Sequence, residues 1–569
     1  MSSTLYGQPA TSQQNVAPYI TQLLLKSNSI PQRFIRNHFA MIGSSTFDYI
    51  WVKSWVIILH SIAPVCVVYC MLLRWCLPKS WRLPIFFEYW AVAETVFCLV
   101  FYLYKRRQLQ RPAVNPPALS KEERQKLFHL CQESTQDAIR YLSGWFLYTP
   151  LTALKRENVK DFFRWAFFNT DLTDSAYDDE VEEYVQSFER RAGLDFEHGR
   201  ADVKCLRLTL DKVDALHRSL VWYWSLLCIS VVDVLTHAYL RFHDFHHYRA
   251  SMRQLFFDVF PPRPLSLLTT HRSPAKNLTY WYRPHTSRTE LPILFLHGIG
   301  VGLYPYMEFM KELNQGRQAE DGVIGILAVE MLPISSRITS PLPRKQEMCR
   351  QLRTILQHHG FGRYGSVIST HLLKTPELAR MIASVVLVDP VSILLHQPDV
   401  AYNFTVRKPK LANEWLLWYF GSKDMGVAHT LSRTFFWSEN ILWKNDLLSH
   451  HATVFLVGKD SIVNAPLVYE YLQSPRGGEV SRTERVSDNG DVVPEDYGSE
   501  RSMAEKDICR GDDRLNVVWC PNLDHGQIFD LPPWRKQLVD ETLARTRGGF
   551  VVQPRGVRFL APNTTTIYT

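Results

Sequence analysis

The chain has 569 residues, of which 46% are hydrophobic and 21% charged, so it is long enough for two or more domains with a large core. Its net charge of +8 is spread along the sequence without a block of lysine and arginine, which argues against a nucleic-acid partner and favours a site next to a membrane. Ten cysteines occur without C-x-x-C pairs, which argues against a disulfide framework or a zinc site.

Two long apolar runs near the N-terminus predict a transmembrane hairpin over residues 51–107. The runs at 55–75 and 83–104 each have about the twenty residues that a helix needs to cross a bilayer. Glu88 and Glu94 interrupt the second run, and a carboxylate in such a place must be kept neutral or paired. The alternative interpretation is a pair of buried helices in a soluble domain.

Basic residues flank both ends of the predicted hairpin. The loop side carries Arg74, Lys79 and Arg82. The other side carries more of them, namely Lys53, Lys105, Arg106, Arg107 and Arg111. Because positive charge is retained on the cytoplasmic side, we expect both ends of the hairpin in the cytoplasm, in an internal membrane.

Residues 108–262, between the hairpin and the next region, are predicted to be helical. Ser120 and Glu123 have the spacing of a capping box, and the residues after them are apolar at helical spacing. A third apolar run at 220–240 either crosses the membrane or packs as a buried or membrane-resting helix. A third crossing would move the C-terminal domain to the opposite side of the membrane.

A histidine cluster follows the third apolar run, at His243, His246 and His247. Its H-x-x-H-H spacing matches the iron-binding boxes of membrane fatty-acid desaturases and hydroxylases. Those enzymes need several such boxes, and this sequence has one. We therefore interpret the cluster as polar residues at a helix end, and we expect no metal and no cofactor.

From residue 263 to residue 548, short apolar runs alternate with amphipathic helical stretches, which predicts an α/β domain with a mostly parallel sheet. The predicted strands are Leu278–Tyr282, Ile293–Leu296, Val323–Val329, Ala383–Val388, Val454–Val457 and Val517–Trp519. A helix with a glycine stop is predicted over Arg344–Gly360.

Three motifs stand in order within this region. They are LPILFLHGIG (Leu291–Gly300), TVFLVGKDSIV (Thr453–Val463) and NVVWCPNLDHGQ (Asn516–Gln527). Taken together, residues 290–545 resemble the α/β-hydrolase superfamily, in particular a fungal-type, membrane-anchored branch of esterase- and lipase-like proteins. The resemblance covers about half of the chain and implies an α/β-hydrolase fold with a helical cap.

The resemblance also implies roles for individual residues. Asp460 would be the acid that orients the histidine, and His525 would be the general base. Gly298 and Ile299 lie in the loop that would supply one oxyanion N–H. Asp389 is an alternative acid, because some members of the family take their carboxylate from the end of that strand.

The nucleophile elbow G-x-S-x-G is not found where the order of motifs requires it. The stretch GFGRYGSVIST (Gly360–Thr370) lacks an apolar strand and a G-x-S, and Tyr364–Lys374 has the pattern of the following helix. In that register Tyr364 would be the second oxyanion donor, and Ser366 a weak substitute nucleophile. We therefore expect a missing strand and elbow, either as a genuine loss or as a short in-frame piece absent from the sequence.

The remaining segments complete the predicted domain organisation. Residues 396–449 resemble the cap and are rich in aromatic side chains, which suits an apolar acyl pocket, membrane contact or cap packing. Residues 474–514 are polar and almost free of aliphatic side chains, so they are predicted to be a disordered insertion. The polar tails are residues 1–50 and 549–569.

The sequence therefore predicts a membrane-associated serine hydrolase of the esterase or lipase type. Its substrate would be a lipid-like or apolar carboxylic ester, and hydrolysis would be impaired because the elbow is missing. The alternative is a non-catalytic protein of the same fold, a pseudoenzyme that binds a ligand or a partner.

Overall fold

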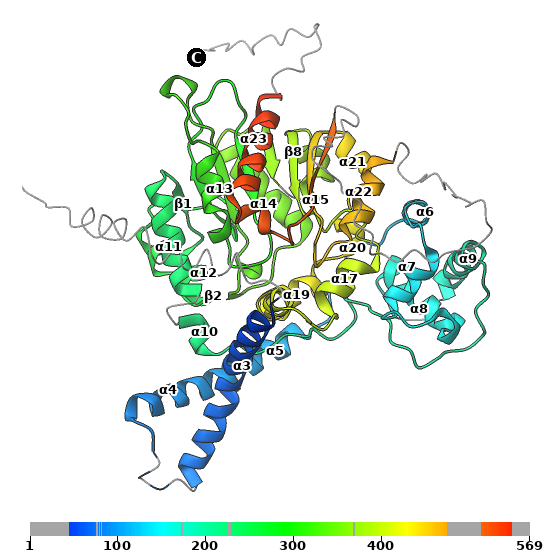
Figure 1. The fold of residues 1–569 in the computed structure, drawn as a ribbon, viewed down its shortest axis with the longest axis horizontal. Helices are drawn as coiled ribbons and strands as arrows, with labels where there is room; N and C mark the ends of the chain where they lie inside the picture. The colour runs from blue at the N-terminus through cyan, green and yellow to red at the C-terminus, as the bar shows by residue number, and fades with distance from the viewer. Residues whose placement is uncertain are drawn as a thin grey trace, which may run out of the picture.

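The computed structural model describes residues 45–75, 78, 80, 82–171, 175–224, 229–367, 370–474 and 514–548. The two predicted polar tails, apart from residues 45–50, and nearly all of the predicted insertion lie outside the described residues. An α/β domain forms the centre of the molecule, a helical region lies against one side of it, and two long helices project from the end where the cap lies (Figure 1).

The α/β domain contains an eight-stranded sheet in the order β1-β3-β5-β4-β7-β8-β9-β10. The strands are β1 (His246–Tyr248), β3 (Thr279–Arg283), β4 (Ile293–Leu296), β5 (Ile326–Glu330), β7 (Tyr364–Val367), β8 (Ile382–Val388), β9 (His451–Val457) and β10 (Leu515–Cys520). β3 is antiparallel to both of its neighbours, whereas β5, β4, β7, β8, β9 and β10 form a parallel ladder in this order. A separate two-stranded sheet pairs β2 (Val259–Phe260) with β6 (Ile338–Thr339).

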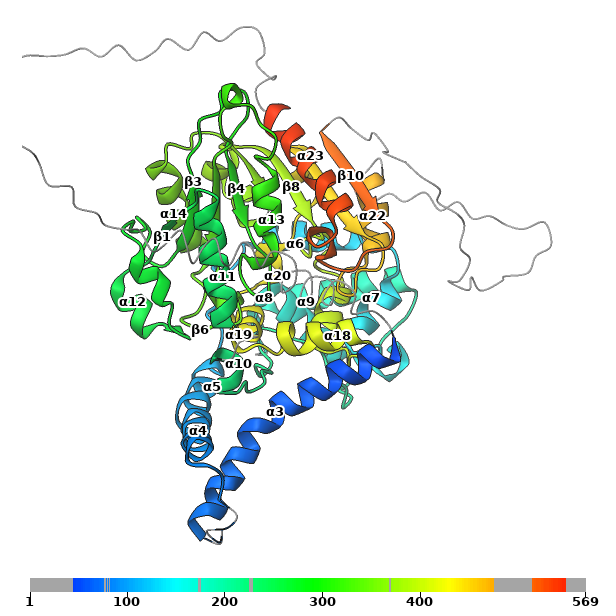
Figure 2. The ribbon, with the colours of Figure 1, turned by 60° about the vertical axis from the view of Figure 1, so that its left-hand side comes forward.

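The predicted apolar strands are confirmed, since each of them lies in this sheet, and its central strands are covered on both faces. Every residue of β4 and β5 is buried, as expected for parallel strands between two layers of helices. Helices α11, α13 and α23 pack on one face (Figure 2), and α14, α15 and α22 pack on the other. The bounds of these helices are α11 (Ile229–Phe242), α13 (Met307–Glu312), α14 (Lys345–His358), α15 (Thr370–Leu373), α22 (Ala465–Gln473) and α23 (Pro532–Gly548). The short helix α16 (Pro376–Ala379) follows α15.

The prediction of a missing central strand is wrong. β7, Tyr364–Val367, lies between β4 and β8 and pairs with both in parallel. The following helix α15 begins at Thr370 rather than at Tyr364. The backbone groups of β4 and β8 need a partner strand between them, and the four residues YGSV supply it although they do not form an apolar run.

The sheet also starts earlier than the expected domain boundary at residue 263, since β1 is formed by His246–Tyr248. Neighbouring residues of a strand point to opposite faces, and accordingly His246 is exposed whereas His247 is buried. The His247 ring contacts the Trp281 ring at a tilted angle, while His243 contacts Tyr239 at the end of α11. The histidines of the H-x-x-H-H pattern therefore serve different parts of the fold.

The third apolar run is bonded into the sheet domain through polar side chains. It forms α10 (Leu220–Trp224) and α11, and its composition would also allow a membrane span over Leu220–Phe242. Asp233 on α11 accepts a hydrogen bond from Arg263 at 2.9 Å and forms an ion pair with Arg337 at 3.0 Å. Because these charged groups are buried against one another, we interpret α11 as a helix of the α/β domain.

Arg263 is the centre of this buried network. Its guanidinium also binds Glu330, at the end of β5, through two hydrogen bonds of 2.8 Å, and contacts His237 of α11 at 3.0 Å. Burial alone would raise the pKa of Glu330, but the guanidinium outweighs burial and holds that pKa well below its usual range. The network therefore joins α11, the segment after β2 and the end of β5 through ionised groups.

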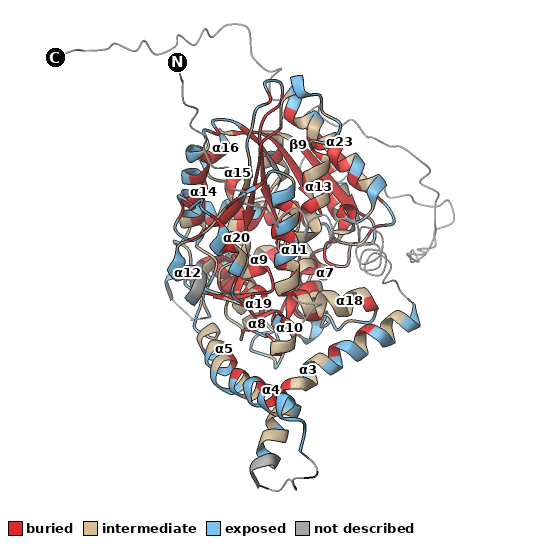
Figure 3. Ribbon diagram, turned by 90° about the vertical axis from the view of Figure 1, so that its left-hand side faces the viewer, coloured by how far each residue is buried: buried red, intermediate tan, exposed pale blue. Residues whose placement is uncertain are grey.

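The two projecting helices correspond to the predicted hairpin. They are α3 (Thr46–Trp75) and a longer helical stretch made of α4 (Ile85–Val96), the π-helical residues Phe97–Tyr102 and α5 (Leu103–Leu109). Both are long and apolar enough to cross a membrane, over Thr46–Leu72 and Ile85–Leu109. Most side chains of their projecting parts are exposed (Figure 3).

Both carboxylates of the second hairpin helix have partners, as expected for acidic groups in an apolar segment. Glu88 accepts a hydrogen bond from the Tyr69 hydroxyl of α3 at 3.1 Å. Glu94 is fully buried, accepts the Leu220 N–H at 2.8 Å and lies 3.4 Å from the His217 imidazole. The Glu94 carboxylate therefore connects the hairpin to the start of α10 through a hydrogen bond.

The helical region and the cap are separate groups of helices around the α/β domain. The helical region has its own aromatic core and consists of α6 (Lys121–Glu133), α7 (Ala138–Trp145), α8 (Arg156–Phe168) and α9 (Ser175–Ala192). The predicted capping box is confirmed, since Ser120 and Glu123 exchange hydrogen bonds with each other's backbone N–H. The cap lies between β8 and β9 and consists of α17 (Pro398–Thr405), α18 (Ala412–Leu416), the π-helical residues Leu417–Ser422, α19 (Met425–Arg433), α20 (Trp437–Asn440) and α21 (Lys444–Leu448).

Candidate active site

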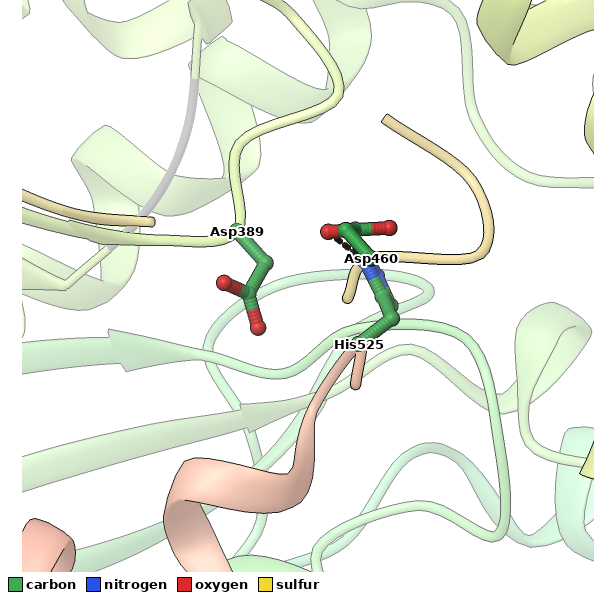
Figure 4. Close-up of side chains that lie close together, drawn as sticks. All are labelled: Asp389, Asp460 and His525. Atoms are coloured by element: carbon green, nitrogen blue, oxygen red, sulfur yellow. Dashed lines mark hydrogen bonds and ion pairs between the residues drawn. The ribbon is translucent and has the colours of Figure 1, made fainter. Parts of the chain in front are cut away.

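An acid and a histidine meet where two neighbouring parallel strands end. Asp460 lies in the turn after β9, and His525 lies in the loop after β10. The Asp460 Oδ2 atom and the His525 Nδ1 atom are 2.9 Å apart (Figure 4). The other oxygen, Oδ1, accepts the backbone N–H groups of Ile462 and Val463 at 2.7 and 2.9 Å. Both carboxylate oxygens are thus engaged, which fixes the carboxylate against the imidazole.

The charge of Asp460 governs the protonation of His525. Burial by itself would lower the pKa of the imidazole, but the nearby carboxylate and its hydrogen bond raise it to about 9. With Nδ1 facing the acid, Nε2 is the nitrogen left to exchange a proton with another group. No hydrogen-bond partner of Nε2 is found within the described residues. The pair can therefore orient and stabilise a base in the way that acyl-transfer sites require.

Asp389 is a second carboxylate beside this pair. It follows β8 with a left-handed backbone (φ 46°), and its Oδ2 accepts the Gly526 N–H at 2.9 Å. Burial raises the pKa of Asp389 to about 7, partly countered by the charge of His525. Asp389 therefore contacts the backbone of the histidine loop, whereas Asp460 contacts the imidazole itself.

One ligand atom from each of Asp389, Asp460 and His525 lies within 4.8 Å of the other two (Figure 4). Two carboxylates and an imidazole form a donor set that a divalent cation could accept. However, Asp460 and His525 already satisfy each other through a hydrogen bond, so we interpret the group as an acid–base site.

The predicted oxyanion loop follows β4. The Gly298 N–H donates to the Tyr306 hydroxyl at 3.3 Å, whereas within the described residues the Ile299 N–H has no hydrogen-bond acceptor. His297 is buried and accepts the Met331 N–H at 2.9 Å, which fixes the start of the loop to the end of β5. This arrangement leaves the Ile299 N–H as the group that can receive negative charge.

Tyr306 connects this loop to the histidine loop. Its ring contacts Phe529 edge-on at 4.7 Å between centroids, and Phe529 lies in the 3₁₀ turn Gln527–Phe529 just after His525. The oxyanion loop and the base loop therefore share an aromatic contact.

The other two predicted site residues, Tyr364 and Ser366, do not lie near Asp460 and His525. Tyr364 is the first residue of β7, and its side chain is fully buried in the core at the opposite end of the strand. Ser366 pairs with Val385, four residues before Asp389, so its backbone lies about 13 Å along the strand direction from the site level. Neither therefore has the predicted role. Ile368 and Ser369, between β7 and α15, lie outside the described residues.

The sequence did not indicate the part that Asp524 and Asn413 have in this site. Asp524 Oδ1 accepts the N–H groups of Ser461 and His525, both at 2.8 Å, so it joins the acid loop to the base loop. Its Oδ2 accepts a hydrogen bond from Asn413 of cap helix α18 at 2.6 Å. No sequence pattern marked Asn413.

The strand order, the cap between β8 and β9, and the loops that carry the acid and the histidine define an α/β-hydrolase fold. No family model matches the chain, and no curated protein matches its sequence. Among solved structures, it is similar to a membrane phospholipase A described as a novel bacterial virulence factor (11% identity, 57% of this chain and 92% of that chain, TM-score 0.32).

Two further solved structures have a comparable sequence identity and TM-score to this chain. One is a putative lipase from Acinetobacter baumannii, with 10% identity over 55% of this chain and 94% of that chain and a TM-score of 0.32. The other is MGS-M2, an α/β hydrolase from a deep-sea metagenome library of the Medee basin, with 14% identity over 49% and 96% and a TM-score of 0.29.

Proposed function

We propose that the protein is a membrane-associated hydrolase of the serine esterase or lipase type that acts on an apolar carboxylic ester. The observation that supports this proposal is the hydrogen bond between Asp460 and His525 at the carboxyl ends of β9 and β10. Asp460 orients the imidazole, His525 takes a proton from the attacking hydroxyl, and the Ile299 N–H receives the oxyanion.

We further propose that hydrolysis by this chain is impaired. In this fold the nucleophile stands in the turn between the central strand and the next helix, flanked by glycines in the pattern G-x-S-x-G. Ser369 is the hydroxyl residue of that connection in the sequence, but Val367 and His371 occupy the two glycine positions. Glycines at those two positions allow the tight turn of the motif, and this sequence has none there.

A fluorophosphonate probe tests the proposed reaction. We expect slow labelling of the full chain, which is lost in His525→Ala and in Ser369→Ala. The matched control is His198→Ala, which removes an exposed histidine of the helical region and leaves labelling unchanged. Labelling that survives both His525→Ala and Ser369→Ala would contradict the proposal.

The same assay has an expected pH dependence. Because the pKa of His525 is raised to about 9, the imidazole is mostly protonated at neutral pH and becomes a base as the pH approaches 9. The labelling rate should therefore rise from pH 7 to pH 9. A rate that falls over this range would show that His525 is not the base.

One observation favours a second candidate function, that of a non-catalytic protein that binds a ligand or partner. Within the described part of the chain, no hydroxyl is hydrogen bonded to His525. In that case the full chain would show no labelling at any pH, while it would still bind a long-chain fatty acid. Saturable binding without labelling would favour this candidate over the hydrolase.

We also propose that the α/β domain faces the cytoplasm. The hairpin crosses the membrane twice, and the bonding of α11 to the sheet supports placing the α/β domain on the same side as the start of α3. The larger number of basic residues on that side favours the cytoplasm. Protease protection in intact organelles tests this topology, and a protected α/β domain would contradict it.

A further inference from the structure

The first half of α3 has two opposite stripes of side chains. One stripe faces the cap and consists of Tyr49, Val52, Lys53, Val56 and Leu59. The outer stripe faces away from the protein and consists of Phe47, Ile50, Trp51, Trp55 and Ile58. Each stripe follows the three- and four-residue spacing of one helix face, so this part of α3 presents two different surfaces.

The cap stripe is packed tightly on the protein. Val52 and Val56 are buried in a cluster with Ala412 of α18 and Tyr419. The Lys53 ammonium lies 5.8 Å from the centre of the Trp415 ring, also on α18. The first half of α3 is therefore fixed to cap helix α18 (Figure 2).

The outer stripe is apolar and largely exposed. Phe47 stacks on Trp51 with ring centroids 6.4 Å apart, and Trp51 meets Trp55 edge-on at 5.8 Å. Leaving such a surface in water is unfavourable, because the free energy rises with the apolar area that water contacts. Tryptophan side chains are instead enriched where the polar headgroups of a membrane meet its acyl chains.

A bilayer around the projecting hairpin would adjoin this stripe. α3 continues from the stripe to Trp75 as one helix, and its second half projects with α4 as the hairpin (Figure 3). A membrane that surrounds the projecting half would therefore begin where the aromatic residues lie. This continuity favours lipid over a second copy of the chain as the partner of the stripe.

We infer that the outer stripe of α3 lies at the headgroup–acyl boundary of the bilayer and holds the active-site end of the sheet at the lipid surface. The connection runs through α18, whose Asn413 donates to Asp524 at 2.6 Å, next to His525. This position of the active site indicates that the substrate is a lipid ester presented from the bilayer, an inference that rests on the proposed hydrolase function.

Photo-crosslinking in phosphatidylcholine vesicles tests the lipid contact without requiring activity. p-Benzoylphenylalanine replaces Trp51, which is 55% exposed, or Ile139 of α7, which is 53% exposed and serves as a matched control. After irradiation, mass spectrometry should find lipid adducts at position 51 and none above background at position 139. The melting temperature of each variant shows whether the chain has remained folded.

Three results would overturn the inference. They are cross-linked dimers at position 51 in place of lipid adducts, adducts between position 51 and residues 1–44, and equal lipid adducts at positions 51 and 139. Because none of these results depends on catalysis, a failure of the lipid contact can be distinguished from a failure of the proposed function.

A second measurement tests the presentation of substrate. The double variant Trp51→Ser and Trp55→Ser should hydrolyse a long-chain ester in phosphatidylcholine vesicles several-fold more slowly and a water-soluble short-chain ester at the unchanged rate. Equal losses for both esters would overturn the role of the stripe in presenting substrate, even if lipid adducts at position 51 are found.

Discussion

The buried network around Glu330 leads to a prediction about the thermal stability of the folded chain. The carboxylate accepts hydrogen bonds from Arg263, twice at 2.8 Å, from Thr279 at 2.9 Å and from Trp281 at 3.2 Å, and it lies 3.3 Å from the His247 imidazole. Glu330→Gln keeps the shape of the side chain but removes the charge. The buried Arg263 guanidinium would then lose one of its two carboxylate partners and keep Asp233, which also pairs with the buried Arg337. The resulting excess of buried positive charge costs about 3–5 kcal/mol.

For a domain of this size, each kcal/mol corresponds to roughly 2–4 °C in melting temperature, so Glu330→Gln should melt about 6–20 °C lower. The assay is thermal unfolding of the full chain in detergent at pH 7. The control is Glu320→Gln, which changes an exposed carboxylate in a 3₁₀ turn and should stay within about 0.5 kcal/mol of the parent. Equal melting temperatures for the two variants would refute the argument that the network holds α11 to the sheet.

The pH dependence of this effect follows from the direction of the pKa change. The folded-state pKa of Glu330 lies well below its usual range, because Arg263 outweighs the effect of burial. Its contribution to stability is therefore present at neutral pH and is lost as the pH falls through that low value. The difference between Glu330→Gln and the parent should shrink only in strongly acidic solution.

Two further predictions concern the site and the cap. Asp460→Asn removes the charge that raises the pKa of His525, so the midpoint for modification of this imidazole by diethyl pyrocarbonate should fall by roughly 1–3 pH units; an unchanged midpoint would contradict the electrostatic argument. Gly426→Ala would place a Cβ atom 2.1 Å from the Pro333 carbonyl oxygen and should lower stability by about 1–3 kcal/mol in thermal unfolding. Gly362→Ala, where no atom lies within 4 Å of the added carbon, is its control, and an equal loss in both would refute the steric argument.

Most of the sheet could be predicted because its central strands are continuous apolar runs. β4 and β8 are buried on both faces, so their side chains alone mark them as strands. β7 could not be predicted in this way, since only four residues contribute and its pairing is decided by the strands on either side. β1 has the same property, as its three residues HHY show no strand pattern.

The acid–base contact could be anticipated from the order of motifs along the chain. Parallel neighbouring strands bring their carboxyl ends together, so Asp460 and His525 had to lie at one edge once β9 and β10 were adjacent. Contacts that depend on how helices dock are not encoded in any local pattern. Asn413 and Asp524 are 111 residues apart, and the packing of α18 brings them together. The partners of Asp233 on α11, which are Arg263 and Arg337, likewise lie in segments distant in the sequence.

The carboxylate of Glu94 has a consequence for biosynthesis. It belongs to the second hairpin helix, yet its hydrogen-bond partner, the Leu220 N–H, is synthesised 126 residues later. At about 5–20 residues per second, the ribosome needs roughly 6–25 s to make that partner. During this interval a newly inserted second helix would hold an unmatched acidic group. In the membrane anchor that we propose, completion of the hairpin would therefore wait for the start of α10, and insertion of the hairpin would be coupled to folding of the domain that follows it.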